Sequence, residues 1–206
     1  MSTETRVISA TGDRWLAEAL AVVRNGGLVA FPTDTVYGLG GLATDADVVE
    51  AIFLAKARPD DKSIPVLVAG WPEVQGVARP GPRVQKLAAA FWPGPLTIVL
   101  ERDTRLPAAI GSTGTVGVRA PNNAVALALL RAAGPLATSS ANLSGDPSPR
   151  TAAEVLKSLA GRIDLLIDGG QVPGGRPSTV VDCTGEGPRL LRRGPVPLEA
   201  ILAAWK

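Results

Sequence analysis

Cationic side chains are concentrated in one short segment, residues 56–62, which reads KARPDDK. Lys56, Arg58 and Lys62 offer two mobile ammonium groups and one planar guanidinium, a mixture that suits an anion with several oxygens, such as a polyphosphate. The segment follows a run that favours a helix and precedes one that favours a strand, and such loops often bind ligands in α/β proteins. An ordinary solvated charged turn is the simpler alternative for this segment taken alone.

Small polar side chains at the ends of other apolar runs are further candidates. Thr35 lies in segment 32–41, which contains three glycines that would let a ligand approach the backbone closely; a Gly-rich turn is the alternative. Arg119 follows an apolar run and precedes Ala120-Pro121, which suits a carboxylate clamp or, alternatively, an exposed ion pair worth little. The remaining candidates are hydroxyl, amide or guanidinium groups: Thr115, Thr138, Ser140, Asn142, Ser148, Ser178 and Arg192.

The sequence contains no histidine and a single cysteine, Cys183. Ser-His-Asp and Cys-His catalysis are therefore excluded, as are zinc sites that need His or several Cys ligands. Cys183 is better explained as a small apolar strand residue, because no histidine is present to activate its thiol. The candidate residues suit charge stabilisation at a polyphosphate better than proton transfer or covalent catalysis, and no protein-bound metal is expected.

Composition narrows the class of protein. The 206 residues are 46% hydrophobic and 19% charged, which fits one large domain over residues 1–206. The net charge of +2 is too small to indicate a nucleic-acid protein by itself. No run of 18 apolar residues could span a membrane, and the N-terminus lacks the apolar core of a signal peptide. These features predict a cytoplasmic protein without an internal disulfide or a membrane partner.

Hydrophobic periodicity, together with start and stop signals, predicts helices. Asp13 is expected to cap the first helix, and Thr44 or Asp45 the second. Pro59 is expected to end the second helix, and Asn122 to cap the fourth. The predicted helical ranges are 13–24, 46–55, 82–91, 122–133, 152–159 and 197–205.

Short apolar runs predict strands, and the glycines of segment 38–41 are interpreted as part of a loop. Helices and strands alternate irregularly, so we expect an α/β fold: a twisted, mixed parallel and antiparallel open sheet with helices on both faces. Such a sheet could gather the polar segments, each at a strand end, on one rim. The predicted strand ranges are 28–31, 64–69, 96–100, 116–118, 136–137, 163–167, 178–183 and 189–195.

Six segments of this chain, in order, resemble the YrdC/Sua5 family of threonylcarbamoyl-AMP synthases. They read FPTDTVYGLG, KARPDDK, WPGPLT, VGVRAP, TSSANLSG, and STVVD followed by LRRGPV. The resemblance extends over residues 13–195, and Lys56, Arg58, Ser140 and Asn142 match the family's site signature, K-x-R…S-x-N. No single segment is specific, but six in order favour the functional interpretation of the cationic segment. The resemblance implies a YrdC-like fold.

The resemblance also implies a nucleotidyltransferase that joins L-threonine, bicarbonate and ATP into threonylcarbamoyl-adenylate and releases pyrophosphate. ATP would be a substrate and would carry Mg²⁺, and a downstream transferase machinery would pass the threonylcarbamoyl group to adenosine 37 of tRNA. The implied catalytic residues, which meet the charge on the leaving pyrophosphate, are Lys56, Arg58 and Lys62. The implied nucleotide-binding residues are these three with Thr115, Ser140, Asn142, Ser148 and Arg192. The implied threonine-binding residues are Thr35, Arg119, Thr138 and Ser178.

Two positions depart from the longer family members, which have a nucleotide-contacting Asn where Lys62 stands and a threonine-contacting His where Leu67 stands. Lys62 is therefore expected to meet phosphate rather than the base, and Leu67 can only pack. The chain ends at Lys206. By this resemblance it is expected to be the single-domain form, without the extra C-terminal domain of the longer members.

Two other functions remain open. A basic concave face could grip tRNA or double-stranded RNA by its backbone without catalysis, and such binding would weaken steeply with salt. The aromatic content of only 4% and the lack of a long basic run favour the enzyme. A paralogue with the same cavity could also use another amino acid or acid as its substrate.

Overall fold

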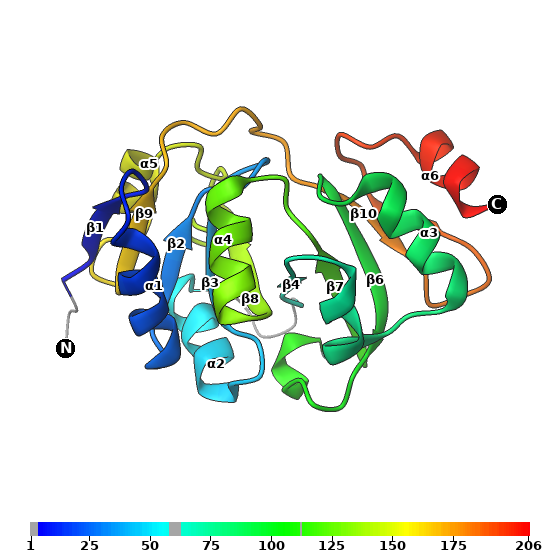
Figure 1. Ribbon diagram of the computed structural model, residues 1–206, viewed down its shortest axis with the longest axis horizontal. Helices are drawn as coiled ribbons and strands as arrows, with labels where there is room; N and C mark the ends of the chain where they lie inside the picture. The colour runs from blue at the N-terminus through cyan, green and yellow to red at the C-terminus, as the bar shows by residue number, and fades with distance from the viewer. Residues whose placement is uncertain (1–3, 58–62, 112) are drawn as a thin grey trace.

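The computed structural model describes residues 4–57, 63–111 and 113–206. Figure 1 shows the strands running across the molecule, with the two ends of the chain on opposite sides. The strands are β1 Arg6–Ser9, β2 Val29–Phe31, β3 Gly38–Leu42, β4 Val66–Leu67, β5 Ala78–Arg79, β6 Leu96–Arg102, β7 Thr115–Arg119, β8 Leu136–Ser140, β9 Leu165–Asp168, β10 Thr179–Asp182 and β11 Arg189–Arg192. The helices are α1 Trp15–Arg24, α2 Ala46–Ala55, α3 Pro82–Phe91, α4 Ala124–Ala133, α5 Ala152–Leu159 and α6 Leu198–Trp205, with 3₁₀ turns η1 Trp71–Gly76 and η2 Ala108–Ile110.

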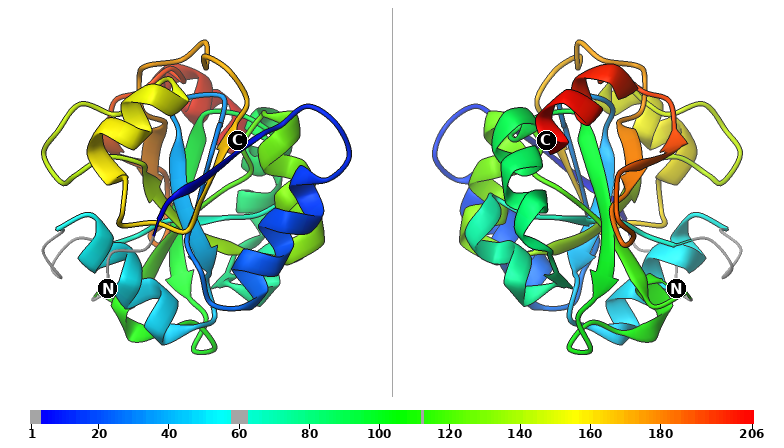
Figure 2. Two further views of the ribbon diagram at one scale, coloured as in Figure 1. Left: turned by 90° about the vertical axis from the view of Figure 1, so that its left-hand side faces the viewer. Right: turned by 90° about the vertical axis from the view of Figure 1, so that its right-hand side faces the viewer.

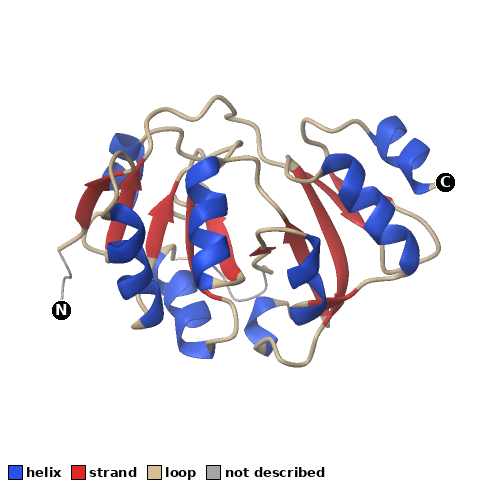
Figure 3. Ribbon diagram, in the orientation of Figure 1, coloured by secondary structure: helices blue, strands red, loops and turns tan. Residues whose placement is uncertain are grey.

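The strands join in one sheet of order β1-β9-β2-β3-β8-β4-β7-β6-β10-β11, and β5 pairs with β6. The β1/β9, β2/β9, β4/β7 and β6/β10 pairs are parallel, whereas the other pairs are antiparallel. Helices lie on both sides of the strands (Figure 3). The predicted α/β fold with a mixed sheet is therefore confirmed.

The helices begin and end close to their predicted bounds. α2, α3 and α5 match them, and Thr151 with Glu154 forms a reciprocal capping box at the start of α5. The expectation for Asp13 was wrong, because α1 starts after Arg14 without a side-chain cap. The expectation for Asn122 was also wrong: Asn123 caps α4. α2 ends at Ala55, and Pro59 lies outside the described residues.

The main correction to the predicted strands concerns the glycines of segment 38–41, which form the buried strand β3 rather than a loop. β3 pairs with β8, which extends to Ser140 rather than stopping at residue 137. Glycine is required by close approach, since a Cβ at Gly40 would lie 2.7 Å from Thr138 Oγ1 and 3.0 Å from the Ala137 carbonyl oxygen. β4 is shorter than its predicted range, and β1 and β5 were not predicted.

Alternate residues along β2 belong to two different hydrophobic cores. Val29 and Phe31 join the core beneath α1 and α4, whereas Ala30 joins the core that includes α2 and α5. Figure 2 shows α1 on one side of the sheet and α5 on the other. None of the helices in the described part of the chain has the length and apolar character that a membrane crossing requires.

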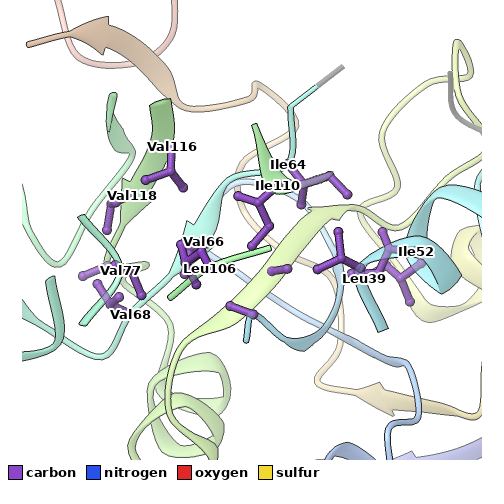
Figure 4. Packing of buried hydrophobic residues seen from close by; sticks show 14 of the residues in the cluster. Leu39, Ile52, Ile64, Val66, Val68, Val77, Leu106, Ile110, Val116 and Val118 are labelled. Atoms are coloured by element: carbon purple, nitrogen blue, oxygen red, sulfur yellow. The ribbon is translucent and has the colours of Figure 1, made fainter. Parts of the chain in front are cut away.

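Alternate side chains of the central strands are buried in the hydrophobic core, so only the side chains between them can face a ligand site. Val66, Val116 and Val118 pack with Ile64, Ile110 and other apolar residues in one cluster (Figure 4). Side chains alternate along a strand, so the residues between these valines point to the opposite face of the sheet. That opposite face carries the candidate site.

Candidate active site

A cavity of about 470 Å³ lies on this opposite face, within the range of about 300–1,000 Å³ that is usual for ligand sites. The floor of the cavity is formed by alternate residues of neighbouring strands and by residues just before those strands. They are Gly38 of β3, Pro65 and Leu67 around β4, Thr97 and Val99 of β6, Thr115, Gly117 and Arg119 of β7, Thr138 and Ser140 of β8, and Val180 of β10. Segments far apart in the sequence therefore meet at one concave surface.

The structure brings most of the predicted site residues to this cavity. Those that line it are Thr35, Thr115, Arg119, Thr138, Ser140, Ser148, Ser178 and Arg192. Lys56 and Asn142 are buried beside Ser140 without lining the cavity, and Arg58 and Lys62 lie outside the described residues. Leu67 lines the cavity in register with Arg119 and also packs in the core under α1 and α4.

Arg119 is buried and held from several directions. Its Nε donates to the Gly94 carbonyl at 2.9 Å, and its Nη1 donates to Thr35 Oγ1 at 3.0 Å. Its Nη2 donates to Asp34 Oδ1 at 2.5 Å, in an ion pair whose side chains are 7% and 13% exposed. Burial lowers the pKa of Arg119, and the Asp34 carboxylate acts in the opposite direction. A guanidinium has five N–H donors, so these three bonds leave two for a ligand.

Asp34 was missed as a functional residue, because a carboxylate inside a turn is an ordinary turn residue in the sequence. Its Oδ1 also accepts a hydrogen bond from the Asn122 backbone N–H at 3.1 Å. A usable signal was present, since a predicted carboxylate clamp such as Arg119 needs a partner that fixes its orientation.

Arg192 reaches the cavity from β11 at a β-bulge. Val180 pairs with Arg192 but the next residue, Val181, pairs with Leu190, so Leu191 is an extra residue in the ladder. Both Leu191 and Arg192 line the cavity as a result. The Arg192 guanidinium donates to the carbonyl and the hydroxyl of Ser178, each at 3.1 Å, and burial lowers its pKa.

Hydroxyl groups occur in hydrogen-bonded pairs around the cavity. Thr33 and Thr35 are 3.1 Å apart between their Oγ1 atoms, and Thr97 Oγ1 lies 2.7 Å from Ser178 Oγ. Thr33 and Thr97 were not among the predicted site residues; Thr97 lies within an apolar run, and Thr33 lies in the segment from which only Thr35 was chosen. A hydroxyl can both donate and accept, so these pairs can adjust to phosphate or amino-acid groups.

Lys56 lies at the end of α2, and its side chain is 1% exposed. Its Nζ donates to the main-chain carbonyls of Ser140 and Asn142, and its own carbonyl accepts from the Ser144 N–H at 2.9 Å. Asn142 Nδ2 donates to the carbonyls of Leu143 and Asp146. These contacts hold the polar segment that follows β8 against the end of α2.

Arg119 and Arg192 are the charged residues among the described lining, and no carboxylate is part of it. The Asp34 carboxylate balances Arg119, whereas Arg192 donates to neutral groups of Ser178. A cavity with this balance attracts anions.

Two other kinds of chemistry find no support at this site. Burial raises the pKa of the Cys183 thiol to about 12, so the thiol stays protonated and fits its predicted role as a small apolar residue. Within residues 4–57, 63–111 and 113–206, no group of three or more Cys, Asp or Glu residues is placed to hold a metal ion. No described residue is therefore assigned as a metal ligand.

Known proteins are similar to this chain in sequence and in fold. The family model of Sua5, YciO and YrdC proteins, described as "Telomere recombination", matches residues 21–194. The threonylcarbamoyl-AMP synthase of Pyrococcus abyssi is 45% identical over 186 residues, which cover 89% of this chain and 55% of the relative. The threonylcarbamoyl-AMP synthase of Bacillus subtilis is 43% identical over 197 residues, covering 94% and 57%. This chain thus spans a little over half the length of these relatives.

A solved structure extends the likeness to three dimensions. The crystal structure of P. abyssi Sua5 complexed with L-threonine matches with a TM-score of 0.92 and 41% identity, covering 98% of this chain and 61% of that chain. The matched sequence includes the strands and loops that build the cavity. The chain belongs to the Sua5/YciO/YrdC family.

Proposed function

We propose that this chain makes L-threonylcarbamoyl-AMP from L-threonine, bicarbonate and ATP, and releases pyrophosphate. The observation that carries the proposal is one cavity with a guanidinium on each of two separate strands and no carboxylate in its described lining. An amino-acid carboxylate and a polyphosphate are two anions that repel each other, and two fixed cations can hold both. The names of the P. abyssi and B. subtilis relatives and the threonine complex of P. abyssi Sua5 support the choice of substrates.

In this proposal Arg119 binds the threonine carboxylate. Its fixed guanidinium has two donors left, and carboxylates bind well to paired guanidinium N–H groups. Thr35, Thr138 and Ser178 line the same cavity and supply hydroxyls for the amino-acid side chain and amine. Leu67, in register with Arg119, supplies an apolar contact.

Arg192 binds the nucleotide phosphates, with hydroxyls from Thr115, Ser140 and Ser148. Lys56 and Asn142 shape the segment that carries Ser140. Arg58 and Lys62 keep the role that the sequence suggests, which is to meet the charge of the leaving pyrophosphate. Mg²⁺ would enter as the counterion of ATP.

The reaction balances in two steps. The threonine amine attacks bicarbonate, an N–C bond forms, and water leaves to give N-carboxy-threonine. A carboxylate oxygen of this carbamate then attacks the α-phosphorus of ATP, and the bond to the β-phosphate oxygen breaks to release pyrophosphate. Most of the acceleration would come from holding the reactants in line and stabilising charge. The product is an activated acyl group, suited to a transferase that modifies an adenosine of tRNA.

The direct test is to incubate the protein with ATP, bicarbonate and each amino acid in turn, and to detect pyrophosphate and an adenylate by mass. We expect both products with L-threonine, and a turnover about 100- to 1,000-fold lower for Arg192→Ala, since removing one preorganised donor costs about 2.7–4 kcal/mol. Arg189→Ala is the matched control, because Arg189 is on the same strand but does not line the cavity, and it pairs with Asp182 at 2.8 Å. Pyrophosphate formation that ignores the amino acid would contradict the proposal.

The same preparation separates the enzyme from an RNA-binding module. Affinity for tRNA or double-stranded RNA through its backbone should fall steeply with added salt. Threonine-dependent turnover of ATP should persist at the same salt concentration. Salt-sensitive RNA binding without such turnover would favour the module instead.

A further inference from the structure

Asp34 is the acidic partner of the buried cation in the cavity. We propose that Asp34 is a positioning residue for the bound amino acid: it fixes the Arg119 guanidinium so that the two remaining N–H donors face the amino-acid carboxylate. The identity of that carboxylate rests on the proposed function. The positioning itself rests on the contacts of Asp34.

The contacts of Arg119 define one orientation of the guanidinium plane. Gly94 holds the Nε side through its carbonyl, and Thr35 and Asp34 hold one donor on each terminal nitrogen. Gly94 and Thr35 are neutral acceptors, so Asp34 alone of the three joins a charged acceptor to the charged donor, which makes its bond the strongest. Removing it frees one terminal nitrogen and leaves two weaker contacts.

Asp34 is itself held in place, which a positioning residue requires. One carboxylate oxygen accepts from both Arg119 Nη2 and the Asn122 backbone N–H. Asp34 therefore ties the turn after β2 to the end of β7 and to the segment that leads into α4. It does not line the cavity, and so it acts on a ligand through Arg119.

The pair also sets how the ligand is recognised. Asp34 balances the charge of Arg119, whereas Arg192 has neutral partners within the described residues. The Arg119 end of the cavity thus recognises a carboxylate by directed hydrogen bonds, and the Arg192 end carries the uncompensated charge. Loss of the Asp34 charge should consequently affect the amino acid and spare the nucleotide.

The test uses Asp34→Asn, which keeps the shape and one acceptor oxygen but removes the charge. Calorimetry should show a loss of affinity for L-threonine of about tenfold or more, because a truncated partner of a buried charge pair has effects of this size. Affinity for ATP should stay within about twofold. Asp103→Asn is the matched control: Asp103 pairs with Arg105 at 2.8 Å, outside the cavity. It should change neither affinity.

A carboxylate-free analogue separates positioning from a general structural role. L-Threoninamide cannot use the carboxylate contact, so its kcat/KM should differ little between Asp34→Asn and the unaltered protein, while that of L-threonine falls. Equal losses for threonine, threoninamide and ATP would overturn the inference. In that case Asp34 would only support the fold.

Nitrogen-15 NMR gives a readout that does not depend on the reaction. The hydrogen-bonded Arg119 Nε–H should give a slowly exchanging signal that broadens or disappears in Asp34→Asn and persists in Asp103→Asn. An unchanged signal in Asp34→Asn would overturn the inference whatever the substrate. A changed signal in a protein that does not bind L-threonine would refute the proposed substrate alone.

Discussion

Lys56 shows how a buried cation can serve a site without lining it. The resemblance to the YrdC/Sua5 family assigns it to the phosphates through the K-x-R…S-x-N signature, but its ammonium group donates to the carbonyls of Ser140 and Asn142. Two backbone carbonyls and one ammonium satisfy each other inside the protein, where an unpaired polar group is costly. At the residue scale, Lys56 therefore connects the end of α2 to the hydroxyl of Ser140 in the cavity.

Lys56→Met should lower the free energy of unfolding by about 2–6 kcal/mol, since two buried carbonyls lose their donor and each such loss costs about 1–3 kcal/mol. ATP affinity should fall as the segment with Ser140 shifts. Urea unfolding and calorimetry would measure the two effects. Lys86→Met, at an exposed position of α3, is the control and should change stability by less than about 0.5 kcal/mol. Equal stability of the two variants would contradict this role.

Single residues were predictable where their chemistry is unusual for their position. Arg119 stands out because it precedes Ala120-Pro121 at the end of an apolar run. Asp34 does not stand out, since its partner is 85 positions away and only the folded chain brings the two together. Candidate ligand groups can be found in a sequence, but the groups that orient them depend on tertiary contacts.

β3 is the element whose observed structure differs most from the structure predicted from the sequence. Glycine is depleted in strands, so the three glycines of segment 38–41 pointed to a loop. β3 forms a strand because it pairs with β2 on one side and with β8 on the other. Glycine is needed at Gly38 and Gly40 because a Cβ at either position would lie too close to the Thr138 side chain. Helix α5 is the opposite case, because its capping box and periodic pattern are local and predict its bounds. Helix bounds can be predicted from local signals, whereas close packing between strands that are distant in the chain cannot be predicted from one sequence.

Gly40→Ala should destabilise the protein by about 1–3 kcal/mol, the usual cost of overpacking. Its methyl group would meet Thr138 Oγ1 at 2.7 Å and the Ala137 carbonyl oxygen at 3.0 Å, and that carbonyl cannot move without disturbing β8. Denaturant unfolding would measure the change. Gly76→Ala is the control, because no atom lies within 4 Å of its added methyl group. Similar stabilities for both variants would contradict the prediction and show that β8 shifts to accommodate the methyl group.

At the scale of the molecule, the connection between β9 and β10 spans the two halves of the sheet. Figure 1 shows this segment, in orange, crossing over the top from one half to the other. Pro177 within it lines the cavity, and the Gly175 N–H donates to the Thr35 carbonyl at 2.7 Å. The chain order could not reveal this contact, because residues 35 and 175 lie in different parts of the sequence.

Gly174→Ala tests the importance of this crossing segment. The added methyl group would overlap the Thr35 carbonyl oxygen, so the turn that carries Thr35 must shift. We expect a loss of about 1–3 kcal/mol in stability, and a larger loss of affinity for L-threonine than for ATP. Thermal unfolding and calorimetry would measure both. Gly185→Ala, with open space around its added methyl group, should behave like the unaltered protein; matching losses there would contradict the prediction.

The crossing segment is also anchored by Tyr37, the one tyrosine in the sequence. The Tyr37 hydroxyl donates to the Gly170 carbonyl at 2.7 Å and accepts from the Gly169 N–H at 3.2 Å. Burial raises the Tyr37 pKa above its usual value of 10, so the phenol stays neutral in the folded state. Its contribution to stability is complete below pH 10 and is lost as the pH rises through the folded pKa.

An alkaline titration followed by the ultraviolet absorbance of tyrosinate would therefore record the ionisation of a single phenol, because the four tryptophans do not ionise in this range. Tyrosinate should appear at a higher pH in the native protein than in urea, and substitutions that loosen the crossing, such as Gly174→Ala, should move the native midpoint toward the urea value. The molecule in this way carries its own optical reporter of whether the segment that joins the two halves of the sheet stays in place beside the cavity.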